Sequence, residues 1–244
     1  MTNNNGITGL LLTLIGWGFK ATAKLRHPRT ETDAIPLPAQ SDKPVIVFIH
    51  GYQGAVSEFA ELYHRLHTAL GDRFDFAAVD TLDPTMDGSP DENARRVVEY
   101  LAEHHLASRD IYLICHSLGG LIARRITHLP DSPPIRAIVM LATPNGGINS
   151  WNLLPIHWMR SHGFTERFAS RYPAIRPIRY LVLAGTKGAN LLEGFPNDGV
   201  VSLQSALALN GDAEIETKTY PLDHWGLLKD EQVVGDIEEF LVRE

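Results

Sequence analysis

Hydrophobic and polar positions along this 244-residue chain alternate between two patterns. Short apolar runs rich in β-branched residues are typical of buried strands, whereas apolar residues every three or four positions are typical of helices. The runs lie at residues 45–49, 74–79, 111–115, 135–141, 178–184 and 215–220, and the helical segments lie at 56–70, 91–105, 118–128 and 233–242. This order predicts an α/β fold, a mostly parallel sheet of about six or more strands covered by helices on both faces.

The alternation begins after residue 43 and predicts one domain over residues 44–244. Residues 1–43 differ in composition, because an apolar and basic arm is followed by a polar, Pro-containing linker from about residue 30. In parallel α/β sheets, active sites gather beyond the carboxyl ends of the strands. We therefore expect chemically active residues directly after the predicted strands.

The strand at 111–115 runs into the sequence CHSLGG at residues 115–120, and a helical segment follows at once. A serine framed by small residues at such a junction is typical of a nucleophile held in a strained turn. The amide of Leu118 and the start of the helix would then stabilise negative charge beside Ser117. The alternative for Ser117 is an ordinary helix N-cap, a position where serine is also preferred.

The first predicted strand ends in the sequence HGYQG at residues 50–54. Glycines allow the backbone to approach a substrate closely and to aim N–H groups at it. We assign the oxyanion hole to the backbone N–H groups of Tyr52 and Leu118, since a tetrahedral intermediate needs such donors. The alternative is a plain turn before a helix, and His50 is expected to fix this loop by hydrogen bonding.

A nucleophilic serine needs a base, and the chain has 11 histidines. His224 lies in a loop between the last predicted strand and the last helix, from which its side chain can reach the sheet edge and exchange a proton with Ser117. The alternative is a loop histidine that only bonds locally. His116 is a poor candidate, because its side chain should point away from that of its neighbour Ser117. His64 and His67 are expected on a solvated helix face, since no zinc motif is completed around them.

The base in turn needs a carboxylate to hold its tautomer. Asp198 lies in a turn-rich loop after the strand at 178–184, at the expected edge of the sheet. Its competitors are Glu193 in the same loop and Asp223, which adjoins His224. We favour Asp198, with a plain Asp-Gly turn as the alternative.

The order Ser117, Asp198, His224 is that of the α/β-hydrolase fold. Over residues 44–242 the chain resembles this superfamily, and within it the lipase and esterase branch that includes small bacterial triacylglycerol lipases and the lipase-like domains of GPI inositol-deacylases. The resemblance rests on the sequences HGY (50–52), CHSLGG (115–120), ATPNGG (142–147), NDGVV (197–201) and DH (223–224). It implies hydrolysis of carboxylic esters through an acyl-enzyme, without metal or organic cofactor.

The chain departs from this family at two positions. Asn145 stands where these lipases usually have histidine, in a loop that should shape the site rather than react. Cys115 stands where the family usually has the first glycine of Gly-x-Ser-x-Gly. A cysteine at the end of a buried strand should be inert, so we expect it to be a packing substitution and not a second nucleophile.

Composition and charge narrow the classes of partner. The chain is 44% hydrophobic and 21% charged, has a net charge of −7 and shows no basic stripe in its body, which argues against nucleic-acid binding. Because Cys115 is the only cysteine, neither an intramolecular disulfide nor a thiolate metal site can form. An acyl ester or lipid fits better as substrate, and the oligomeric state is left open.

The N-terminal arm has four basic residues and no acidic one within residues 1–29. Its apolar stretch at residues 7–19 is shorter than the roughly 20 residues that span a bilayer. Residues 7–29 could make peripheral membrane contact, pack on the body as a helical arm, or be a cleaved signal ending near residues 21–23. Cytoplasmic or peripheral membrane localisation is favoured, with secretion or a periplasmic location as the alternatives.

An insertion between the fourth and fifth strands, at about residues 148–177, is rich in aromatic and aliphatic residues. It is a candidate lid in which Trp151, Leu154 and Trp158 would bind an acyl chain, whereas the alternative is simple cover for the sheet. The sequence thus predicts a lipase- or esterase-like serine hydrolase. A thioesterase, amidase or acyltransferase with the same triad, or a catalytically silent, membrane-associated binding module, are the alternatives.

Overall fold

The computed structural model describes residues 35–39, 41–52, 54–80, 82, 90–147, 171–188 and 196–243. Several predicted features lie outside these residues. They are the arm at 7–29, the acid candidate Glu193, and the expected acyl-binding residues Trp151, Leu154 and Trp158. Their predicted roles therefore stay predictions.

The described residues form a six-stranded sheet in which every neighbouring pair is parallel. In spatial order its strands are β2 (Asp75–Ala78), β1 (Val45–Ile49), β3 (Ile111–His116), β4 (Ile135–Leu141), β5 (Arg179–Gly185) and β6 (Glu214–Tyr220). The parallel α/β sheet expected from the sequence is confirmed. Its carboxyl ends all lie at one edge, so the loops after β1, β3, β5 and β6 meet there.

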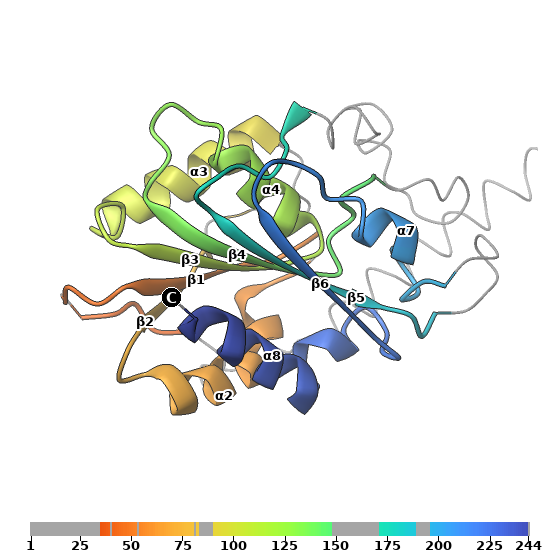
Figure 1. Ribbon diagram of the computed structural model, residues 1–244. Helices are drawn as coiled ribbons and strands as arrows, with labels where there is room; N and C mark the ends of the chain where they lie inside the picture. Colours follow the sequence, from red (N-terminus) through yellow and green to blue (C-terminus); the bar gives the residue numbers. More distant parts are fainter. Residues whose placement is uncertain are drawn as a thin grey trace, which may run out of the picture.

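Helices cover both faces of the sheet (Figure 1). On one face lie α3 (Pro90–Glu103) and α4 (Leu118–Ile126), and on the other lie α2 (Ala60–Leu70) and α8 (Glu231–Val242). Three shorter elements complete the described part of the chain: η2 (Val56–Phe59), α7 (Leu203–Ala206) and η3 (Gly226–Leu228). The three-layer arrangement buries the apolar stripe of each long helix against the sheet.

Alternate side chains of each central strand enter two separate cores. In β1, Val45, Val47 and Ile49 pack with α3 and α4, whereas Ile46 and Phe48 pack with α2 and α8. All five residues of β1 are buried, which explains its continuous apolar sequence. The edge strand β6 is mostly exposed or half-buried and carries charged side chains instead. The strands that lead into the Gly51 and Ser117 turns, β1 and β3, thus lie in the buried interior of the sheet.

Most element boundaries shift by one or two residues from the sequence prediction, and two segments differ in kind. Residues 56–70 were expected as a single helix, but the segment opens as the 3₁₀ turn η2 and becomes α-helical only at Ala60. The short helix α7 was not predicted, and the Ser202 side chain caps it by accepting a hydrogen bond from the Ser205 N–H. Each is about one turn long, which is too short for apolar periodicity to mark it.

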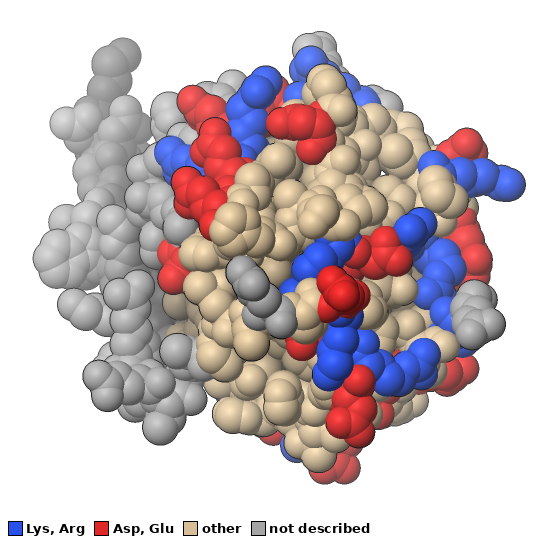
Figure 2. All heavy atoms as spheres, turned by 90° about the vertical axis from the view of Figure 1, so that its left-hand side faces the viewer, with Lys and Arg blue, Asp and Glu red and all other residues tan. Residues whose placement is uncertain are grey.

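The surface seen in Figure 2 carries Lys and Arg side chains interspersed with Asp and Glu, and no single sign dominates this face. Opposite charges also pair directly, as in the ion pairs between Lys218 and Asp236 and between Arg243 and Glu216. Within the described ranges, no helix has the length and apolar character needed to cross a membrane.

Candidate active site

Ser117 occupies a strained turn between β3 and α4. Its backbone angles are φ 52° and ψ −122°, a region that a residue with a side chain rarely adopts. The turn is held from outside, because the Ser117 N–H donates to the Leu141 carbonyl at 2.8 Å. Although Ser117 stands at the N-cap position, its side chain makes no capping hydrogen bond. The plain N-cap alternative therefore does not describe this serine.

Glycines allow two neighbouring segments to press against this turn. A Cβ atom added to Gly51 would lie 2.7 Å from the Ser117 Cβ and 3.3 Å from the Leu118 N. A Cβ added to Gly119 would lie 2.2 Å from the Ile49 carbonyl oxygen. Only glycine fits at either position without movement of the backbone. The Gly51 loop consequently runs beside the amide of Leu118, which begins α4 and has no carbonyl partner within its own helix.

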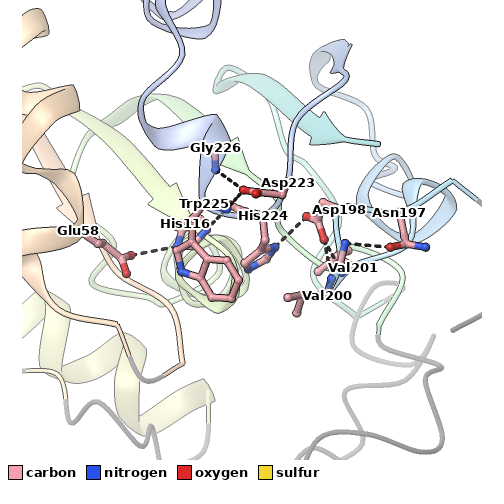
Figure 3. A network of polar contacts seen from close by, with 11 residues as sticks. Glu58, His116, Asn197, Asp198, Val200, Val201, Asp223, His224, Trp225 and Gly226 are labelled. Atoms are coloured by element: carbon pink, nitrogen blue, oxygen red, sulfur yellow. Dashed lines mark hydrogen bonds and ion pairs between the residues drawn. The ribbon is translucent and has the colours of Figure 1, made fainter. Parts of the chain in front are cut away.

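His224 and Asp198 form a buried pair on the loops that follow β6 and β5 (Figure 3). The His224 Nδ1 lies 2.8 Å from the Asp198 Oδ2, and the two side chains are 3% and 2% exposed. The His224 N–H also donates to the Asp198 carbonyl at 2.9 Å. Since an ionised carboxylate only accepts, Nδ1 carries a proton and Nε2 is the nitrogen left for chemistry. Among the described residues, none hydrogen-bonds this Nε2.

The Asp198 carboxylate is held ionised by its surroundings. Burial alone would raise its pKa, but the neighbouring His224 and the backbone N–H groups of Val201 and Val200 more than offset this and lower the pKa of Asp198. These two amides donate to the Asp198 Oδ1 at 2.7 and 2.9 Å. The remaining oxygen, Oδ2, is thereby directed at the imidazole.

Asp223, the competing acid next to His224, is engaged elsewhere. Its Oδ1 accepts the N–H groups of Trp225 and Gly226 at 3.2 and 2.7 Å. It closes the local turn that leads from the loop into η3. The structure therefore pairs His224 with the distant Asp198 and not with its sequence neighbour.

Three further residues lie as their sequence context indicated. Cys115 is completely buried, and burial raises the pKa of its thiol, so a thiolate is disfavoured there. His50 donates from Nδ1 to the Gly51 carbonyl at 2.9 Å and so fixes its own loop. Asn145 is buried, donates from Nδ2 to the Ala206 carbonyl at 2.9 Å and accepts from Arg124, as expected of a loop-shaping residue.

Glu58 and His116 form a second buried pair, which was not predicted from the sequence. The His116 Nδ1 lies 3.0 Å from the Glu58 Oε1, and its Nε2 lies 3.1 Å from the His224 carbonyl oxygen (Figure 3). Burial would lower the pKa of His116, but the Glu58 carboxylate outweighs it and the pKa is raised. Glu58 precedes Leu62 by four positions and so lies on an apolar helix face, which is the one sequence signal that could have revealed it.

No cluster of three or more His, Cys, Asp or Glu side chains suited to a metal ion occurs in the described ranges. His64 and His67 are exposed on α2, on the solvated face expected for them. The candidate site offers a serine in a strained turn after β3, and a histidine of fixed tautomer beside an ionised carboxylate on the loops after β6 and β5. These are the groups that nucleophilic catalysis by serine uses.

A family model described as "Domain of unknown function (DUF7379)" matches residues 18–150, more than half of the chain. No curated protein matches the sequence. In structure the chain is similar to the lipase BlEst2 of Bacillus licheniformis, at 21% sequence identity and a TM-score of 0.63 over 84% of this chain and 95% of the lipase.

Two further structures are similar at lower identity. The mouse alpha/beta hydrolase domain-containing protein 10 is 16% identical, with a TM-score of 0.55 over 83% of this chain and 90% of that protein. The esterase RhEst1 from a Rhodococcus species is 15% identical, with a TM-score of 0.56 over 83% of this chain and 92% of the esterase. These likenesses confirm the α/β-hydrolase fold that the sequence predicted.

Proposed function

We propose that this chain, which belongs to the family described as a domain of unknown function, DUF7379, is a serine hydrolase that cleaves carboxylic esters through an acyl-enzyme. The single observation that carries the proposal is the backbone of Ser117. Ser117 is held at φ 52°, and its hydroxyl makes no capping hydrogen bond to the helix that follows. For a purely structural role, an unstrained residue would serve better at this position. Strain of about 1–3 kcal/mol is typical of such positions and persists where it serves chemistry.

In the proposed reaction, the Ser117 hydroxyl attacks the ester carbonyl while the His224 Nε2 takes its proton. Asp198 holds the His224 tautomer and stabilises the imidazolium without taking the proton itself. The backbone N–H groups of Tyr52 and Leu118 receive the charge on the carbonyl oxygen. His224 returns its proton to the departing alcohol, and a water molecule activated by the same nitrogen then releases the acid. Each step is complete without a metal or an organic cofactor.

For the substrate, we propose a lipid or other acyl ester. The similar structures named lipase and esterase support this class. The insertion at about residues 148–177 would supply the acyl site, with Trp151, Leu154 and Trp158 along the chain of the bound acid. Residues 7–29 would bring the enzyme to a membrane surface.

The test is hydrolysis of p-nitrophenyl butyrate and p-nitrophenyl palmitate by the full chain and by Ser117→Ala. We expect the wild type to turn over at least the short ester and Ser117→Ala to lose about 1,000-fold or more of that activity, because the nucleophile is gone. Reaction with the palmitate ester would establish a lipase, and its absence would leave an esterase.

Two further measurements distinguish the alternative functions. A thioesterase, amidase or acyltransferase would prefer its own acyl donor or acceptor, which product analysis with competing nucleophiles reveals. A catalytically silent binding module would not react with a fluorophosphonate probe at Ser117. Ester hydrolysis that persists in Ser117→Ala would overturn the proposal.

A further inference from the structure

Glu58 and His116 form a buried acid–histidine pair that the proposed reaction does not use. Their side chains are 2% and 3% exposed, and they come from η2 and from the last residue of β3. A buried ionisable pair is costly to bring out of water and contributes little net stability compared with apolar residues of the same volume. Its presence beside the Ser117 turn therefore needs an explanation other than packing.

The two contacts of His116 determine how many protons the pair holds. The His224 carbonyl can only accept, so the His116 Nε2 must carry a proton. A second proton lies between Nδ1 and the Glu58 carboxyl group, on one or the other. The pair is therefore neutral as a unit, and Glu58 fixes the proton on Nε2 by occupying Nδ1. Without a group at Nδ1, a neutral imidazole is free to move its proton away from Nε2.

The carbonyl group that accepts the His116 hydrogen bond belongs to His224, the proposed base. The backbone of His224 is thus held on both sides, by Asp198 at its N–H and by His116 at its carbonyl. The rings of His116 and His224 are also in contact, with centroids 4.7 Å apart. The loop that carries His224 is in this way tied to the last residue of β3, directly before Ser117.

The acid end of the pair reaches the other side of the site. A Cβ atom added to Gly54 would lie 2.6 Å from the Glu58 Oε2, so this carboxyl group lies directly against the loop after β1. That loop carries the Tyr52 amide of the proposed oxyanion hole. The Glu58–His116 pair therefore connects the loop after β1, through the last residue of β3, to the backbone of His224.

We propose that Glu58 and His116 are positioning residues that lock the His224 backbone beside the Ser117 turn. The inference rests on the proposed function, because it assigns His224 as the base. It predicts that the hydrogen bond to the His224 carbonyl matters and that the charge of Glu58 does not.

The first test compares Glu58→Gln with Glu58→Leu on a short ester. In Glu58→Gln the amide can donate to Nδ1, so Nε2 keeps its proton and kcat should stay within about 3-fold of wild type. In Glu58→Leu nothing fixes the proton, and kcat should fall about 10- to 100-fold with KM little changed, since a misplaced base slows the chemical step. A leucine variant with wild-type kcat, or equal losses in both variants, would overturn the proposal.

The second test acts on His116 in the Glu58→Gln background, so that no unpaired charge is left buried. A glutamine at position 116 can place its amide where Nε2 was and donate to the His224 carbonyl, whereas a leucine cannot. We expect Glu58→Gln/His116→Gln to retain most of the kcat that Glu58→Gln/His116→Leu loses. Equal kcat values for the two double variants would contradict a positioning role. Thermal melts of both variants show whether a loss of kcat comes from unfolding instead.

A readout independent of activity separates this inference from the proposed function. A buried ring N–H that donates to a carbonyl exchanges slowly with water, so the His116 Nε2 proton should give a protected imidazole signal by NMR, which is assigned to His116 by its loss in Glu58→Gln/His116→Leu. The signal should persist in Glu58→Gln and vanish in Glu58→Leu. If no ester is cleaved but this pattern appears, the proposed function is wrong, whereas the proposal that Glu58 and His116 hold the His224 backbone is supported. If esters are cleaved but the signal is absent from the wild type, the lock fails alone.

Discussion

Two buried histidine–carboxylate pairs lie at the same edge of the sheet, His224 with Asp198 and His116 with Glu58. Their Nδ1 to oxygen distances are 2.8 and 3.0 Å, and the exposures of the side chains match. They differ at the second ring nitrogen. The His116 Nε2 is taken by a backbone carbonyl, whereas the His224 Nε2 has no hydrogen bond among the described residues. We therefore propose different roles for the two histidines. His224, whose Nε2 has no hydrogen bond among the described residues, is the proposed base, and His116 is the proposed positioning residue.

Matched carboxylate-to-amide changes should separate the two pairs most clearly. Asp198→Asn should lower kcat by about 10,000-fold, because an amide that donates to Nδ1 leaves His224 in the wrong tautomer for accepting a proton at Nε2. Glu58→Gln should cost almost nothing, because His116 needs only to keep the proton on its Nε2. Steady-state kinetics of both variants on one ester make the measurement. Losses of similar size would mean that the two pairs do the same work.

The dependence of stability on pH should have opposite signs in the two pairs. The pKa of Asp198 is lowered in the folded state, so its stabilisation is present above about pH 4, the unfolded pKa, and is lost as the pH falls below it. The pKa of His116 is raised, so its stabilisation is present below about pH 6.5 and is lost as the pH rises through the folded value. One proton changes the free energy of unfolding by at most about 1.4 kcal/mol per pH unit.

Thermal melts from acid to alkaline pH would measure this difference. Asp198→Asn should flatten the acid limb of the stability curve and leave the limb above pH 6.5 in place. Glu58→Gln should do the reverse, because His116 no longer gains a carboxylate partner on folding. A wild-type curve whose neutral-to-alkaline limb is unaffected by Glu58→Gln would contradict the pairing in solution.

The smallest effect is expected at Cys115, which lies two residues before Ser117 and is not a member of either pair. Because the thiol is buried and its pKa is raised, Cys115→Ala should retain most activity and lose about 1 kcal/mol or somewhat more of stability from the small cavity. Urea unfolding and ester kinetics on the variant test both numbers. Loss of activity without unfolding would make Cys115 part of the chemistry.

The fold was predictable because each central strand is apolar on both faces and is followed by a helix of clear periodicity. The position of Ser117 followed from the same pattern, since a strand ending and a helix beginning within two residues leave space only for a sharp turn. Asp198 and Asp223 were harder to separate. Both precede or lie within tight turns. Only the structure reveals that the Asp223 Oδ1 accepts hydrogen bonds from the amides of Trp225 and Gly226.

Glu58 and His116 were beyond the reach of local patterns. They are 58 positions apart in the sequence, and they meet only because the fold places Glu58 of η2 beside the last residue of β3. The His116 side chain was expected to point away from Ser117, but the sequence did not indicate which residue it would contact. Neither periodicity nor turn chemistry carries such long-range information.

The strained backbone of Ser117 also bears on how the protein folds. Its supports come from Leu141 in β4 and from Gly51 after β1, which lie 24 and 66 positions away along the chain. Such non-local contacts form late, because chain entropy must be lost before they can stabilise anything. A nascent or partly unfolded chain would let this turn relax to an ordinary conformation. Under the proposed function, an incomplete molecule would therefore lack the backbone geometry that Ser117 needs to react.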